Sequence, residues 1–178
     1  MSFRPLFIFF VSVSVFVLSA CSSTNYEEEI LGDWECSIFI DAEKAADLFD
    51  LDDAEGMQLE TTLSGTEEYL RGGRYNSEGD ITLRISAEGQ EFSLRFHYRE
   101  AGTYEIHGDH VVSITEDSKY TPLDEMTRNF IGNVPEFADA MAPVKGESSS
   151  MEIISMAEGS MQVVMDDLPG MIISYQRL

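Results

Sequence analysis

The chain has 178 residues, of which 33 are Asp or Glu and 11 are Lys or Arg, which gives a formal net charge of −22. This excess of negative charge excludes nucleic acids and anionic lipid headgroups as partners, because binding a polyanion requires clustered Lys or Arg side chains. The length suits a single domain that buries a substantial core. The acidity either keeps the protein soluble or attracts a cationic partner, and acid runs such as NYEEEI and FDLDDAEG favour the first interpretation.

Residues 1–20 have the pattern of an export signal. Arg4 supplies a positive charge near the start, and Leu6 to Leu18 form an almost uninterrupted apolar segment. At 1.5 Å per residue, this segment would span roughly 20 Å as a helix, which is less than the ~30 Å hydrocarbon core of a bilayer. We therefore predict a cleaved signal peptide rather than a transmembrane helix.

The signal ends in the sequence LSAC, Leu18 to Cys21, which resembles the lipobox of bacterial lipoproteins. In those proteins the signal is cut before the cysteine, and the cysteine sulfur carries a diacylglycerol. The resemblance implies that lipid on Cys21 anchors the protein to a membrane of the cell envelope. Ser22 implies sorting to the outer membrane, facing the periplasm or the cell surface. The alternative is an ordinary secretory signal cut after Ala20, which leaves a free cysteine.

Residues 21–29, CSSTNYEEE, precede the first predicted strand. We expect them to form a short acidic tether that reaches at most about 30 Å, followed by a single β domain over residues 30–178. With Cys21 lipidated, Cys36 has no partner for a disulfide within the chain. We interpret Cys36 as a small apolar side chain in a strand.

Most of the domain alternates apolar and polar residues with the period of a β-strand, as in ITLRIS (81–86) and EFSLRFHYR (91–99). The turn-rich segments SEGD, AEGQ, REAG, HGDH and AEGS recur roughly every ten residues, which is typical of antiparallel hairpins. The predicted strands are 30–40, 56–63, 67–76, 81–86, 91–99, 102–107, 110–118, 151–157, 160–166 and 171–177. We therefore predict a mainly β fold, an antiparallel barrel of about 8–10 strands.

Two segments have the pattern of helices. Asp41 to Phe49 starts with an N-cap aspartate followed by helix-forming residues. Pro122 to Ala142 places apolar residues at spacings of three and four, and Pro135 should break it into two short helices. This insert either packs across the end of the barrel or covers a pocket as a lid.

The first predicted strand lies in the sequence ILGDWECSI, which resembles the GxW start of lipocalins and lipocalin-like bacterial domains. The segments GTYEIHGDHVVSI and MIISYQRL are similar to late strands of lipocalin-like lipoproteins. The resemblance implies a barrel closed at one end by Trp34, with an interior that holds a small apolar molecule. The insert at 122–142 departs from a plain eight-stranded lipocalin.

The sequence is compatible with two classes of function, a binding module and a metal-dependent enzyme. The favoured one is a membrane-anchored binding module for a small apolar ligand or an envelope protein. We expect its ligand to contact one strand face and the helical insert, at Phe92, Leu94, Phe96, Met126, Phe130, Ile131 and Phe137. Five late methionines either line an adaptable apolar surface or fill the core: Met151, Met156, Met161, Met165 and Met171.

The alternative function is a metal-dependent envelope hydrolase built around His97, His107 and His110, with Asp109 as a further ligand. The segment HGD also reads as a tight turn, where polar residues are common. No nucleophile stands beside a basic partner in a recognised motif. We therefore predict no catalytic residue and no cofactor.

Overall fold

The computed structural model describes residues 25–49, 57–87, 89–142, 145–157, 159–166, 168 and 170–178. The predicted signal peptide, Cys21 and the first residues of the tether lie outside the described residues. Within the described ranges, no helix is long and apolar enough to cross a membrane.

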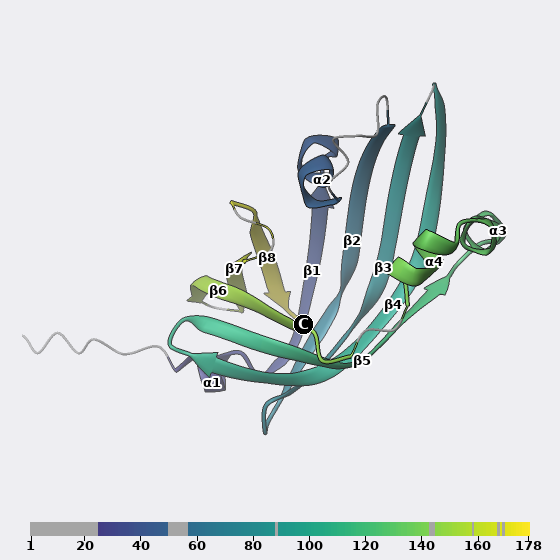
Figure 1. Cartoon of the computed structure of the whole chain (residues 1–178). Coiled ribbons are helices and arrows are strands. Elements are labelled where there is room, and N and C mark those ends of the chain that lie inside the picture. Colours follow the sequence, from purple (N-terminus) through teal and green to yellow (C-terminus); the bar gives the residue numbers. More distant parts are fainter. Residues whose placement is uncertain are drawn as a thin grey trace, which may run out of the picture.

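The described residues form a mainly β fold, as predicted, with eight antiparallel strands in one sheet (Figure 1). The strands are β1 (Gly32–Ile40), β2 (Met57–Leu70), β3 (Arg74–Ala87), β4 (Gln90–His107), β5 (His110–Pro122), β6 (Ser148–Ala157), β7 (Ser160–Met165) and β8 (Ile172–Arg177). Each strand pairs with the next along the chain, and β1 also pairs with β8. The sheet therefore closes on itself as a ring.

The strands on one side of the ring are much longer than the strands on the other side. Strands β2, β3 and β4 have 14, 14 and 18 residues, whereas β7 and β8 have only six each (Figure 1). β8 pairs with β1 only along Trp34 to Cys36, and β6 pairs with β5 only along His110 to Ile114. The upper inner faces of the long strands therefore have no strand of the short side opposite them.

Two of the predicted turns lie inside strands, and these predictions are wrong. The segment SEGD is part of β3, and REAG is part of β4. A Cβ atom at Gly79 would lie 2.9 Å from Cε1 of Tyr98, and one at Gly102 would lie 2.8 Å from Cε1 of Tyr75. Both glycines therefore make room for a tyrosine ring on the sheet, which is a known reason for glycine within a strand.

The predicted strand 67–76 is also wrong, because it crosses the turn between β2 and β3. That turn is Arg71 to Gly73, where Gly72 and Gly73 have φ angles of 90° and 71°. Glycine adopts these angles without the steric cost that other residues incur. The residues of the predicted strand belong to two long strands joined by a tight hairpin.

The two segments predicted as helices, 41–49 and 122–142, do contain helices. In α2 (Ala42–Phe49), the backbone amide of Lys44 donates to Oδ1 of Asp41 at 3.0 Å, as expected for an N-cap. The insert forms α3 (Glu125–Asn133) and α4 (Pro135–Ala140), separated at Val134 next to the proline. Figure 1 shows this helix pair beside the upper part of β3 and β4.

The insert is attached to β4 through Thr127, whose side chain is fully buried. Its hydroxyl accepts a hydrogen bond from the backbone amide of Arg95 at 2.9 Å, and its own amide donates to Oδ1 of Asp124 at 2.7 Å. This hydrogen bond holds the pKa of Asp124 below its usual value. The start of α3 is thus both capped and tied to the sheet.

The end of the predicted tether is not extended, because α1 (Tyr26–Glu29) forms one helical turn there. Arg177 of β8 donates hydrogen bonds to the backbone carbonyls of Leu31 (2.8 Å) and Glu29. Ile30, directly after α1, is fully buried. Tyr26 to Glu29 therefore belong to the folded domain.

Two apolar clusters fill the ring. The larger contains Trp34 and side chains from several strands together with three of the late methionines, Met151, Met161 and Met171, while Met156 and Met165 pack partly buried against it. The smaller contains Leu83, Leu94 and Phe96 and packs against the insert. Trp34 is fully buried, its Nε1 donates to the carbonyl of Ile30 at 2.6 Å, and the Arg177 guanidinium lies 4.5 Å from its ring centre.

Because Trp34 is fully enclosed, Trp34→Ala should lower the free energy of unfolding by about 3–5 kcal/mol. Urea denaturation measures this value. Phe39→Ala is the matched control on the same strand, because Phe39 is 59% exposed and its loss should change stability by no more than about 0.5 kcal/mol. Equal effects of the two substitutions would contradict this account of the core.

Candidate functional site

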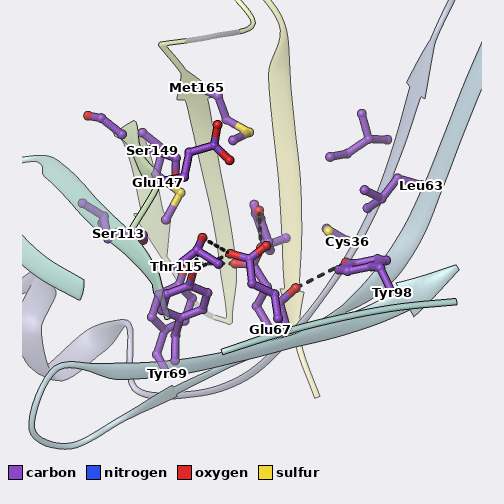
Figure 2. A pocket seen from close by; sticks show the side chains of 18 of the residues that line it. Cys36, Leu63, Glu67, Tyr69, Tyr98, Ser113, Thr115, Glu147, Ser149 and Met165 are labelled. Atoms are coloured by element: carbon purple, nitrogen blue, oxygen red, sulfur yellow. Dashed lines mark hydrogen bonds between the residues drawn. The ribbon is translucent and has the colours of Figure 1, made fainter. Parts of the chain in front are cut away.

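A cavity of about 380 Å³ lies inside the ring, and all eight strands contribute side chains to its lining (Figure 2). This volume lies within the range of roughly 300–1,000 Å³ that is typical of small-molecule sites. Figure 2 shows Glu67 at the centre of the view, with Cys36 and Leu63 on one side and Thr115 on the other. The cavity touches both apolar clusters, because Met151 belongs to the larger one and Ile81 packs against the smaller one.

One part of the lining is apolar. Ile38, Leu63 and Ile81 are cross-strand neighbours on β1, β2 and β3, so their side chains form one row on the inner face. Val111, Met151 and Met165 are the other aliphatic and thioether side chains of the lining. This part of the cavity can bury the hydrocarbon portion of a ligand.

The other part of the lining contains three carboxylates, Glu67, Glu100 and Glu147, of which the first two lie in one row. Glu67, Ser77 and Glu100 are neighbours in register on β2, β3 and β4. Two strand spacings separate the backbone positions of the two glutamates, which corresponds to roughly 10 Å. Both side chains line the same cavity, so an acidic row runs across the long side of the ring.

Hydroxyl groups hold these carboxylates. The hydroxyls of Tyr69 and Tyr175 donate to Glu67 at 2.8 and 3.3 Å. At Glu100, Tyr75 and Thr115 both donate to Oε1, the latter at 2.9 Å. Among the described residues, neither glutamate forms an ion pair with a Lys, Arg or His side chain.

Burial raises the pKa of Glu67, and the negative charge of Glu100 raises it further. The hydroxyls of Tyr69 and Tyr175 counteract part of this rise by hydrogen bonding to the carboxylate. Burial likewise raises the pKa values of Tyr69 and Tyr175, so their hydroxyls remain protonated donors. The site therefore keeps an acidic group under electrostatic strain, which is a common property of functional sites.

Cys36 also lines the cavity and is only 4% exposed. Burial raises the pKa of its thiol to about 12, and the charge of Glu67 adds to this effect. The thiol is therefore protonated at neutral pH and is a poor nucleophile. The interpretation of Cys36 as an apolar side chain in a strand is confirmed.

The residues predicted to contact the ligand meet in a different place from this cavity. Phe92, Leu94 and Phe96 on β4 pack with Phe130, Ile131 and Phe137 of the insert. The ring centres lie 5.7 Å apart for Phe92 and Phe130, 5.9 Å for Phe96 and Phe137, and 5.4 Å for Phe130 and Phe137. Met126 is 49% exposed and borders a shallow surface depression with Phe92 and Phe130.

None of these seven predicted residues lines the interior cavity. Ile81 and Tyr120 connect the two places, because both pack against the aromatic cluster and both line the cavity. The insert is thus positioned as a neighbour of the cavity wall, one layer away from its contents.

The predicted metal-binding residues are separated. His97 and His107 are ten positions apart on β4, which corresponds to roughly 33 Å. Each histidine has its own acidic neighbour: Asp80 for His97 at 2.9 Å, Glu105 for His107 at 3.2 Å and Asp109 for His110 at 2.8 Å. The hydrogen bond that the His110 ring makes to the Asp109 carboxylate raises the pKa of His110. In the described part of the chain, no group of three His, Cys, Asp or Glu residues is placed to hold a metal.

The sequence analysis missed Glu67 and Glu100. The alternation in β2 carried a signal, because Glu67 is in phase with the inward residues Leu63 and Tyr69. In a chain with 33 acidic residues, one acid on the inward face of a strand is easily hidden by composition. The register across three strands, which pairs Glu67 with Glu100 through Ser77, follows only from the structure.

Comparisons with known proteins give no family assignment. No protein-family model matches the chain, and no curated protein matches it significantly.

The raised pKa of Glu67 predicts a specific dependence of stability on pH. An acid with a higher pKa in the folded state stabilises the fold below its unfolded pKa of about 4.5, and this stability is lost as pH rises through the folded pKa. Glu67→Gln should therefore raise the melting midpoint at pH 8 by roughly 2–4 °C, the shift that about 1 kcal/mol produces in a domain of this size. At pH 4 the two proteins should melt alike.

Glu35→Gln is the control for net charge, because Glu35 is exposed on the outer face of β1. Thermal melts of the three proteins from pH 4 to pH 8 make the comparison. If Glu67→Gln lowered the midpoint at pH 8, the carboxylate would be stabilising the fold and the argument for electrostatic strain would be wrong.

Proposed function

We propose that this protein is a membrane-anchored binding module of the cell envelope, which holds a small, partly apolar molecule inside a lipocalin-like barrel. The observation that carries the proposal is the 380 Å³ cavity lined by inward side chains of all eight strands. An interior cavity favours a small ligand over a docked envelope protein, because a protein surface cannot enter it.

Several features support the resemblance to lipocalins. The eight strands follow one another around a closed ring, and β1 begins with Gly32 and the buried Trp34. The contacts of Trp34 with Ile30 and Arg177 fit the expectation that this tryptophan closes one end of the barrel. The insert of α3 and α4 remains a departure from a plain lipocalin.

The strand lengths suggest a route into the cavity. β6, β7 and β8 leave the upper inner face of the long strands without a partner strand. Glu147 and Ser148, at the start of β6, line the cavity on the side of these short strands. We propose that the ligand enters there and that the insert, on the opposite wall, restricts the upper end as a lid.

The proposed anchor is a lipid on Cys21. Only four residues separate Cys21 from α1, so the link between the lipid and the folded domain spans at most about 17 Å. The domain would then lie close to the membrane surface, where it could exchange an amphipathic molecule with the bilayer.

Because the cavity is the proposed site, filling it should abolish binding. Ser113→Phe adds a ring to a half-buried lining position of β5. The acylated protein in nanodiscs is titrated with three soluble probes, n-hexylammonium, 1-hexanol and hexanoate, by isothermal titration calorimetry with empty nanodiscs as the blank. We expect saturable one-site binding of at least one probe to the unmodified protein and none to Ser113→Phe.

Ser37→Phe places the same ring on the exposed outer face of β1 and should leave binding unchanged. A negative heat-capacity change should accompany binding, because apolar surface is buried. If the unmodified protein bound none of the three probes, or if Ser113→Phe bound as well as Ser37→Phe, the cavity would not be the site.

The anchor has its own test. Cys21→Ser removes the sulfur that the lipobox resemblance assigns to the diacylglycerol, so metabolic labelling with a tritiated fatty acid should be lost. The protein should be either uncleaved or released from the envelope fraction. Labelling equal to that of the unmodified protein would show that the anchor is elsewhere or absent.

A further inference from the structure

In the acidic row of the cavity, Glu67, Ser77 and Glu100, neither glutamate has a charged partner among the described residues. In the described residues, all hydrogen bonds to these two carboxylates come from uncharged hydroxyls. At Glu100, both of these donors bind Oε1. Carboxylates that are partly removed from water are normally paired with a cation, and in the described part of the chain these two glutamates, both half-buried, have none.

The arrangement suits a ligand that supplies this cation. An ammonium group has three donors and can bridge acceptors on both glutamates. The aromatic rings of Tyr69, Tyr75, Tyr98 and Tyr175 line the same space, and aromatic rings attract cations through their electron-rich faces. A carboxylate ligand would instead add a further negative charge to a cavity that Glu67, Glu100 and Glu147 already line, and a neutral ligand would leave these glutamates without a counter-charge.

The distance between the acidic row and the apolar row indicates how long the apolar part of the ligand is. Along β2, Leu63 lies four positions from Glu67, which corresponds to roughly 13 Å. A short hydrocarbon chain is therefore long enough to reach from the acidic row to the apolar row of Ile38, Leu63 and Ile81. Between the two rows, Gly65 and Gly79 are paired on β2 and β3, and the ring of Tyr98 from β4 lies over them. A ligand that contacts both rows must therefore pass along this ring.

We infer that the ligand is a primary amine with a short hydrocarbon body, whose ammonium group binds Glu67 and Glu100 and whose apolar part packs on Ile38, Leu63 and Ile81. This inference rests on the proposed function of the cavity as a ligand site and names the chemical class of its ligand. Simple alkylamines carry a positive charge at neutral pH, as the side chain of lysine does.

The charge of Glu67 should control the affinity. The titratable groups that face it are Cys36 on β1, Tyr69 on β2, Tyr75 on β3, Tyr98 and Glu100 on β4, and Tyr175 on β8, and Glu147, just before β6, lines the same cavity. Because burial raises the pKa of Glu67, the carboxylate ionises above the usual range, and the affinity for an ammonium group should rise with pH across that step. The affinity for a neutral probe should not change in this way.

The test compares the same three probes, which match in chain length and differ in headgroup. Titration of the acylated protein in nanodiscs should show n-hexylammonium binding roughly tenfold or more tightly than 1-hexanol, with hexanoate weaker than both. Glu67→Gln and Glu100→Gln should each weaken hexylammonium binding roughly tenfold and leave hexanol binding unchanged. Glu35→Gln removes the same charge from the outer face and should change neither.

The outcomes separate this inference from the proposed function. If no probe binds, the cavity is not a ligand site and both fail. If 1-hexanol or hexanoate binds as tightly as hexylammonium, or if the two glutamine variants keep full hexylammonium affinity, the cavity binds ligands but the inference of an amine is wrong. Equal losses for hexylammonium and hexanol in both variants would also overturn it, because the glutamates would then act only on the shape of the cavity.

Discussion

Closure of the sheet between β1 and β8 is the constraint on which the rest of the structure depends. Only three register pairs join these strands, and Arg177 reinforces the junction by contacting Trp34 and the backbone of Glu29 and Leu31. Because the ring is closed, every inward side chain of eight strands must fit into one interior. The short strands cannot fill the space that the long strands enclose, and a cavity results.

The register of the long strands then decides the chemistry of that cavity. Each side chain on the inner face has a fixed neighbour on the next strand, so a one-residue shift in pairing would turn the acidic row outward. Glycines at positions 79 and 102 give the tyrosine rings space, and the pairing of β4 with β5 shifts register between Ala101 and Gly102. The ring thus encloses a half-buried carboxylate whose pKa its surroundings raise, and this carboxylate gives the site its charge.

The sequence was sufficient for some features of this fold and insufficient for others. The alternation of apolar and polar residues identified a mainly β fold, and Pro135 located the break between α3 and α4, because both are local effects. Strand length was misjudged because a glycine that accommodates a ring looks the same in sequence as a glycine in a turn. The inward acids and their common row depend on pairing between distant segments, which local periodicity does not contain.

The dependence on tertiary packing also explains why the residues expected to contact the ligand do not line the cavity. The aromatic residues of β4 and the insert were identified as one apolar surface, and they do lie together. Their rings pack on one another, so the cluster supports the wall of the cavity instead of lining it. Sequence spacing shows which side chains share a face, but the packing of two such faces depends on the tertiary fold.

A crystal structure of the protein with n-hexylammonium tests the central claim most directly, namely that the acidic row inside the closed ring holds a cation. The account predicts the ammonium nitrogen within about 3 Å of a carboxylate oxygen of Glu67 or Glu100, with the alkyl chain directed toward Ile38, Leu63 and Ile81. An empty cavity at saturating hexylammonium, or a molecule bound only at the outer surface near Met126 and Phe130, would contradict it.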